Sequence, residues 1–170
     1  MKVLFLKRHK NALTYLFLGL ILFILYLYQN VNTLPSPFGL IPAIVVVYVA
    51  VCGSIMGEYV GCVMGFMGGL LCDVSAPSSY CFNLVVLTAI GIACGFLGTR
   101  LFTRRFVCTL TLSFLALVVY FILQWLVVGV IFGNEGFYYL LRYSLPSVLY
   151  SLLYVLPVYP LVSIINKRIS

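Results

Sequence analysis

The chain has 170 residues, of which 64% are hydrophobic and only 8% are charged. A water-soluble domain needs far more charge to cover its surface, so this composition predicts an all-α integral membrane protein. The formal net charge is +7, but the basic residues form short runs beside apolar segments, as the positive-inside rule predicts. The charge therefore does not indicate nucleic-acid binding. The length suits a single polytopic membrane domain over residues 1–170.

The first predicted transmembrane helix covers residues 11–29 and follows a basic start. A secretory signal peptide is the alternative, but the segment lacks an A-x-A-like cleavage site and is long enough to cross a bilayer. Five more apolar segments predict helices over residues 39–57, 60–73, 81–99, 107–132 and 143–165.

The boundary between the second and third predicted helices is set by length and by charge. A single helix from Leu40 to Cys72 would be about 50 Å long at 1.5 Å per residue, whereas the hydrocarbon core is about 30 Å thick. Six spans also place both termini and every basic cluster on the cytoplasmic side, whereas merging these two helices would separate them. We therefore predict a tight turn near Gly57–Gly61 and a short third helix. The residues that determine this topology are Lys7, Arg8, Lys10, Arg100, Arg104, Arg105, Lys167 and Arg168.

Glycines recur at four-residue intervals through the second and third predicted helices, at Gly53, Gly57, Gly61, Gly65 and Gly69. This spacing advances about 400° around a helix, so the glycines follow one face. Within lipid, helices associate through close backbone approach and van der Waals contact, which small residues permit. The pattern is consistent with packing among the second, third and fourth helices. It is also consistent with a groove for the transmembrane helix of another protein.

Two of the three acidic residues, Glu58 and Asp73, flank the third predicted helix. They are separated by about 22 Å along a straight helix, whereas paired carboxylate chemistry needs about 5–10 Å. Each carboxylate is costly near a membrane unless it reaches water, a hydrogen-bond donor or a partner charge. Interfacial solvation, a structural or partner contact, and a transport site all remain open for each of them.

No arrangement of residues predicts an enzyme, a metal site or a cofactor. The single histidine, His9, cannot form a triad or a metal site alone. The six cysteines show no C-x-x-C spacing, so a zinc site is disfavoured, although Cys72 and Cys81 flank one loop and a disulfide between them remains an alternative. In the last predicted helix, prolines predict a kink. These prolines are Pro146, Pro157 and Pro160.

Two stretches, "GEYVGCVMGFMGGLLCDVSAPSSYCFNLVVLTAIG" and "LPSVLYSLLYVLPVYPLVSIINKR", resemble the MreD family of bacterial rod shape-determining proteins. The resemblance extends to the length, the six short spans and the basic loop before the fifth. The family pattern of an acidic residue, a glycine-rich helix, an "LL-x-D" end and an asparagine corresponds to Glu58, Gly61–Gly69, Asp73 and Asn83. One departure is that Tyr80–Cys81–Phe82 precedes the asparagine, where family members often have a glycine.

The resemblance implies a non-enzymatic scaffold subunit of the cell-elongation (rod) complex in the bacterial cytoplasmic (inner) membrane. Such a subunit supports cell shape and lateral peptidoglycan synthesis. It would bind the transmembrane helix of MreC and, indirectly, MreB, RodA and a class B penicillin-binding protein. The glycine face would pack helices and seat the MreC helix, and Asp73 would anchor its outer mouth by hydrogen bonding.

The MreD fold is similar to that of the vitamin-binding subunits of energy-coupling-factor transporters, which supply the alternative function. Those subunits often offer an AxxxA-like face in the first span for docking. Here the interior of that span has only a lone Gly19, which favours the scaffold. An oligomeric pore such as a holin is disfavoured because no span shows a polar stripe.

Overall fold

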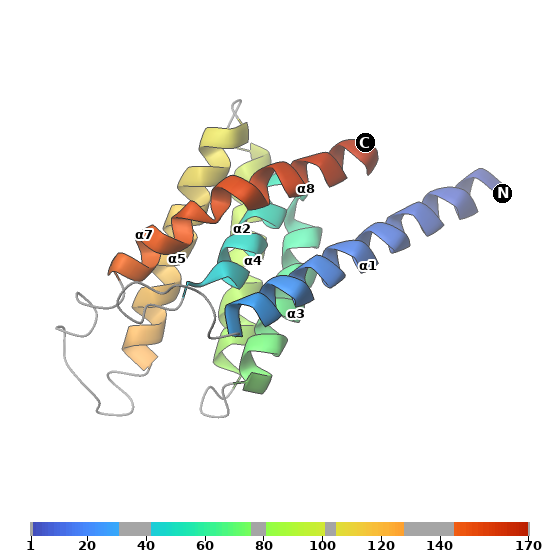
Figure 1. Ribbon diagram of the computed structural model, residues 1–170. Coiled ribbons are helices and arrows are strands. Elements are labelled where there is room, and N and C mark those ends of the chain that lie inside the picture. The colour runs from blue at the N-terminus through green and yellow to red at the C-terminus, as the bar shows by residue number, and fades with distance from the viewer. Residues whose placement is uncertain (1, 31–41, 76–80, 101–104, 128–144, 170) are drawn as a thin grey trace.

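The computed structural model describes residues 2–30, 42–75, 81–100, 105–127 and 145–169, with side chains described for 14–30, 42–75, 81–100, 106–127 and 146–167. Within these ranges the chain forms helices and no strand, which confirms the all-α prediction for the described residues (Figure 1). The helices are α1 (Lys2–Asn30), α2 (Ile44–Met56), α3 (Glu58–Ser75), α4 (Phe82–Arg100), α5 (Arg105–Trp125), α7 (Leu145–Leu153) and α8 (Val155–Ile169).

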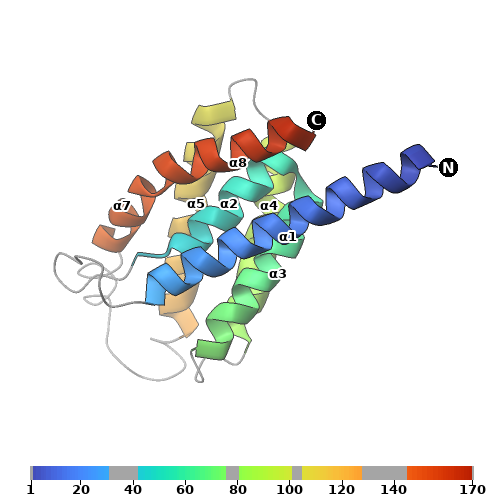
Figure 2. The same ribbon diagram turned by 45° about the vertical axis from the view of Figure 1, so that its right-hand side comes forward.

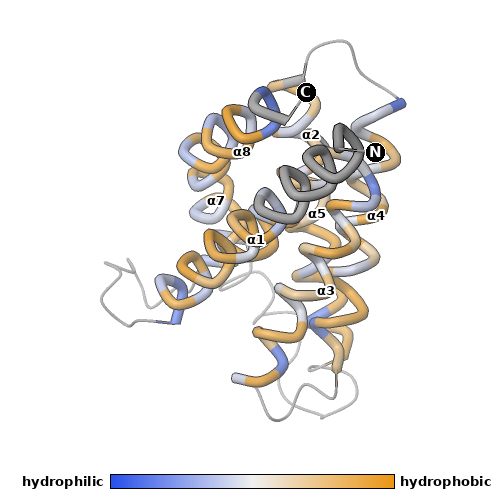
Figure 3. The backbone as a smooth tube through the Cα atoms, turned by 90° about the vertical axis from the view of Figure 1, so that its right-hand side faces the viewer, coloured by the Kyte–Doolittle hydropathy of each residue, from blue (hydrophilic) through white to orange (hydrophobic). Residues whose placement is uncertain are grey.

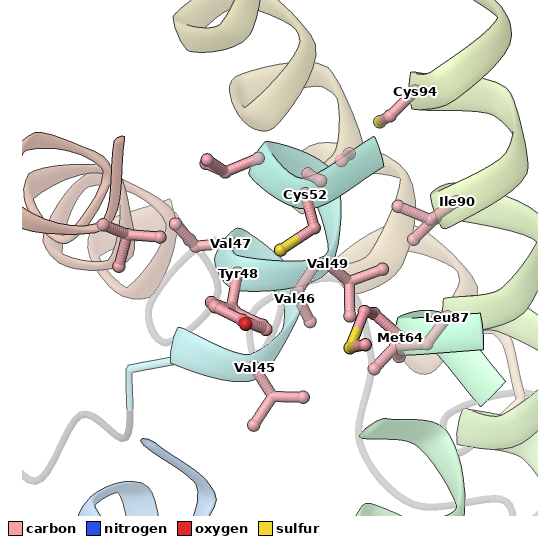
Figure 4. Packing of buried hydrophobic residues seen from close by; sticks show 14 of the residues in the cluster. Val45, Val46, Val47, Tyr48, Val49, Cys52, Met64, Leu87, Ile90 and Cys94 are labelled. Carbon is pink, nitrogen blue, oxygen red and sulfur yellow. The ribbon is translucent and has the colours of Figure 1, made fainter. Parts of the chain in front are cut away.

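Helix α2 is the centre of the bundle and contacts each of the other described helices. In Figures 1 and 2, α1 and the α7–α8 pair run in an oblique direction similar to that of α2, while α3, α4 and α5 run more steeply behind it. All of its residues from Ile44 to Gly53 are buried. A helix that is apolar on every side is stable only where neighbours surround it. Figure 4 shows this packing, with Val49 close to Met64 and Leu87.

The short helix is α2 and not, as the sequence predicted, the third one. Helix α2 has 13 residues and α3 has 18, so α2 is about 20 Å long and does not cross a bilayer core alone. The predicted span began at residue 39, but Ala43 still has a non-helical backbone, with φ −85° and ψ 64°. The apolar composition of this segment therefore did not show where the helix begins.

The predicted turn between the second and third helices is confirmed and consists of one residue, Gly57. Its φ of 96° and ψ of 178° are accessible almost only to glycine. The Gly57 N–H still donates to the Gly53 carbonyl at 2.9 Å, and the Gly61 N–H donates to the Gly57 carbonyl at 3.0 Å. The chain therefore changes direction without leaving these backbone groups unpaired.

The predicted kink in the last helix is also present, because Tyr154 separates α7 from α8. The Tyr154 N–H donates to the Ser151 carbonyl, three residues back, at 3.1 Å. Pro157 has no N–H to donate to the carbonyl of Leu153, so regular helical bonding stops there. A second proline, Pro160, lies inside α8.

In the part of the chain that the structure describes, three helical segments are long and apolar enough to cross a membrane, namely Phe82–Arg100, Phe106–Trp125 and Pro146–Lys167. Thr14–Asn30 and Ile44–Met56 are shorter apolar helices. Figure 3 shows hydrophobic residues along the middle of the bundle and hydrophilic segments mainly at helix ends. The start of α1, the end of α8 and the adjoining ends of α4 and α5 lie at the same end (Figures 1 and 2). The described composition and geometry are those of a membrane protein.

Candidate functional site

The glycine face of α3 packs directly against the backbone of α4. A Cβ atom added to Gly61 would fall 2.8 Å from the carbonyl carbon of Gly91, and one added to Gly65 would fall 2.9 Å from Leu87 C. A Cβ atom on Gly69 would lie 2.7 Å from Asn83 O. Real Cβ contacts are almost never this short. The two backbones are therefore so close that only glycine fits at these positions.

Helix α2 meets the same stretch of α4, so three helices converge at Gly91. A Cβ atom on Gly53 would lie 2.6 Å from Gly91 O. Glycines of α4 complete the contact, because Gly95 faces the backbone of Glu58 and Gly98 faces Ser54, with 2.7 Å between the added Cβ and Ser54 Cα. We call this contact among α2, α3 and α4 the glycine seam.

Gly57 is the exception among the five predicted positions. The nearest atom to an added Cβ is Thr99 Cγ2 at 3.9 Å. Glycine is therefore required at this position by its backbone angles and not by a lack of space for a side chain. At Gly68, which lies outside the predicted ladder, an added Cβ would lie 2.9 Å from Val45 Cγ1. Since α4 of the same chain occupies the groove, internal packing is the explanation that this geometry favours.

At the far end of the seam, Asp73 caps the first turn of α4. Its carboxylate accepts the backbone N–H of Asn83 at 3.1 Å and that of Leu84 at 2.9 Å. These N–H groups have no partner within the helix, and a carboxylate also interacts favourably with the positive end of the helix dipole. Asp73 and Asn83, which the sequence analysis singled out, are thus brought together.

The Asn83 side chain extends this polar junction to α5. It is 7% exposed, and its Oδ1 accepts the hydroxyl of Tyr120 at 2.9 Å. The Asp73–Asn83–Tyr120 junction therefore ties α3, α4 and α5 at one end of the bundle. Sequence reasoning missed Tyr120 because it lies 37 residues from Asn83 and no local pattern marks it. Glu58 lies at the opposite end of α3 with an exposed side chain, as interfacial solvation requires.

Side chains from three other helices satisfy the buried ends of α2. The Ala43 N–H donates to Ser151 Oγ at 2.9 Å, and the Val45 N–H donates to Gln29 Oε1 at 3.1 Å. At the other end, Asn166 Nδ2 donates to the Ile55 carbonyl at 3.4 Å. These interactions pair backbone groups at the ends of α2 that have no partner within the helix. The sequence analysis did not identify Gln29, Ser151 or Asn166, since their partners lie on distant segments.

The cysteines are free thiols, Cys72 and Cys81 included, so the alternative disulfide is not formed in this structure. Within the described ranges, no group of three metal-ligating side chains comes together.

The predicted topology residues lie at helix ends. Arg100 ends α4 with its guanidinium 4.4 Å from the centre of the Phe96 ring, and Lys167 is exposed on α8. Lys7, Arg8 and Lys10 lie in the first turns of α1, Arg105 begins α5 and Arg168 is near the end of α8. Arg104 lies outside the described residues.

Comparison of the chain with protein-family models, with curated proteins and with solved structures gave no match.

Proposed function

We propose that the chain is a non-enzymatic scaffold subunit of the bacterial cell-elongation complex and a member of the MreD family. The observation that carries this proposal is the Asp73 cap. Asp73 and Asn83 are both part of the pattern by which the chain resembles the family, and the carboxylate of one accepts the N–H of the other at 3.1 Å. Two motif residues that form a hydrogen bond with each other support the family assignment more strongly than a similar composition does.

The proposed topology has six spans in the cytoplasmic (inner) membrane, with both termini inside. The arrangement of the helix ends supports it, because the ends that carry the basic runs lie together (Figures 1 and 2). The positive-inside rule assigns that end to the cytoplasm. Helix α2, with 13 helical residues, is the central helix of this proposed arrangement.

A scaffold needs a rigid body and an apolar outer surface, and the described residues provide both. The glycine seam and the caps of α2 and α4 fix the helices through backbone contacts. Large apolar side chains face outward, among them Tyr59, Phe66, Val85, Leu115 and Leu149. Because α4 fills the groove, we propose that the MreC helix binds this outer surface and not the glycine ladder.

The alternative, a vitamin-binding transporter subunit, gains no support from α1. Its interior glycine, Gly19, lies toward α3, with 3.7 Å between an added Cβ and Met67 Cε. Gly19 therefore lies beside a side chain of α3 in the same chain.

Co-purification from a rod-shaped bacterium tests the proposal. The tagged chain is co-expressed with MreC, extracted in mild detergent and isolated. We expect MreC to co-purify, and to be lost when its transmembrane helix is replaced by that of an unrelated single-span protein. Recovery of transporter ATPases and a bound vitamin, with no MreC, would refute the scaffold and support the alternative.

A further inference from the structure

The basic residues on the described helices gather at one end of the bundle. Eight of the ten lysines and arginines lie in three described regions, namely the first turns of α1, the adjoining ends of α4 and α5, and the end of α8. Figures 1 and 2 place these three regions at the same end of the molecule. Among the described residues, Glu58 is the acidic residue at this end, and it offsets only one of these charges. This end, which we call the basic end, is therefore strongly positive.

We propose that the basic end binds the headgroups of anionic phospholipids. Arg100 shows the geometry that such binding requires. Its side chain is exposed, and its contact within the described residues is with the ring of Phe96, itself 45% exposed. The cation is held over an apolar side chain on the outer surface of α4, so its hydrogen-bond donors are available to an external phosphate.

The position of the charges favours a lipid over a soluble anion or an acidic protein. Lys167 follows exposed apolar residues of α8, among them Leu161 and Ile164, as Arg100 follows those of α4. Cations that end apolar membrane helices lie at the depth of lipid phosphates. The basic start of α1 extends beyond the other helices at this end (Figures 1 and 2), which adds a second cluster near the same headgroup layer.

Lipid retention by the purified full-length chain tests this proposal. The chain is reconstituted in vesicles of equimolar phosphatidylglycerol and phosphatidylcholine, re-extracted in mild detergent, and its bound lipids are measured by mass spectrometry. We expect phosphatidylglycerol to be enriched about threefold or more, since each cation near an anionic surface contributes a severalfold preference. Arg100→Gln together with Lys167→Gln should remove about half of this enrichment or more.

The control variant is Arg142→Gln, which removes a basic residue outside the three regions and should keep the enrichment. A thermal-unfolding curve for each variant establishes that it is folded. Equal retention of the two lipids by the wild-type chain would overturn the proposal. The single variant Arg100→Gln is measured in the same way. If Arg142→Gln loses as much phosphatidylglycerol enrichment as Arg100→Gln does, the proposal is also overturned, because net charge, and not the position of the charge, would then explain lipid binding. Displacement of phosphatidylglycerol by millimolar inorganic phosphate at constant ionic strength would assign the site to free phosphate instead.

Discussion

The carboxylate of Asp73 accepts the backbone N–H of Leu84 at 2.9 Å, so the last turn of α3 caps the first turn of α4. The same carboxylate accepts the N–H of Asn83, whose side chain receives the Tyr120 hydroxyl. Asp73 thus begins a chain of hydrogen bonds that connects α3, α4 and α5. This role explains a carboxylate in so apolar a chain without invoking chemistry at that position.

Replacing Asp73 should destabilise the chain in proportion to the acceptors removed. Asp73→Ala removes both acceptor oxygens and should lower stability by about 1–3 kcal/mol. Asp73→Asn keeps one acceptor oxygen and should cost less. Unfolding in detergent can be followed with a thiol-reactive dye, because Cys52, Cys94 and Cys108 are buried in the folded chain.

Thr111→Ala is the control for this series. The Thr111 hydroxyl donates to carbonyls of its own helix, at Val107 and Cys108, and its side chain is exposed. Removing this hydroxyl should change the midpoint of thermal unfolding only slightly. If Asp73→Ala unfolds at the same temperature as Thr111→Ala, the cap does not stabilise the fold.

The cap of α2 by Ser151 predicts a similar sensitivity inside the bundle. Ser151→Ala leaves the Ala43 N–H without its partner, and both groups are buried. The expected loss is about 1–3 kcal/mol, because an unpaired buried donor retains its full desolvation cost. The midpoint of thermal unfolding, compared again with Thr111→Ala, measures it, and no difference between the two variants would argue against the cap.

Gly57 should tolerate no other residue, although space surrounds it. With φ 96° and ψ 178°, a side chain imposes strain of about 1–3 kcal/mol whatever its size. Asparagine relieves strain in the left-handed helical region, but ψ at Gly57 lies far from that region. Gly57→Asn and Gly57→Ala should therefore lower the unfolding midpoint equally. A clear rescue by asparagine would show that the turn has another geometry.

Several features of the fold could be predicted from the sequence because they depend on local chemistry. The break at Gly57 followed from helix length, and the kink near Tyr154 followed from Pro157, which cannot donate a backbone hydrogen bond. The four-residue glycine spacing correctly placed Gly61, Gly65 and Gly69 on one helix face.

Other features depend on contacts between distant segments and left no local signal. The sequence could not show that α2 is short and central. An apolar segment has the same composition whether lipid or other helices surround it. The bonds to α2 from Ser151 and Asn166 join residues 108 and 111 positions apart. Nothing in the sequence marked one serine or asparagine of the last helix over another.

Helix α4 of the same chain, and not a partner helix, fills the glycine groove. Thermal unfolding of the chain purified alone tests it most directly, with Gly65→Ala compared against Gly19→Ala. Alanine favours helix by up to about 1 kcal/mol at both positions. At Gly19 an added Cβ meets an ordinary contact of 3.7 Å, whereas at Gly65 it falls 2.9 Å from Thr88 Cα in the backbone of α4.

We therefore expect Gly19→Ala to unfold at or above the wild-type temperature and Gly65→Ala to lose about 1–3 kcal/mol of stability or fail to fold. If Gly65→Ala, isolated without any partner, is as stable as Gly19→Ala, the groove is open in the free chain and the internal seam is contradicted.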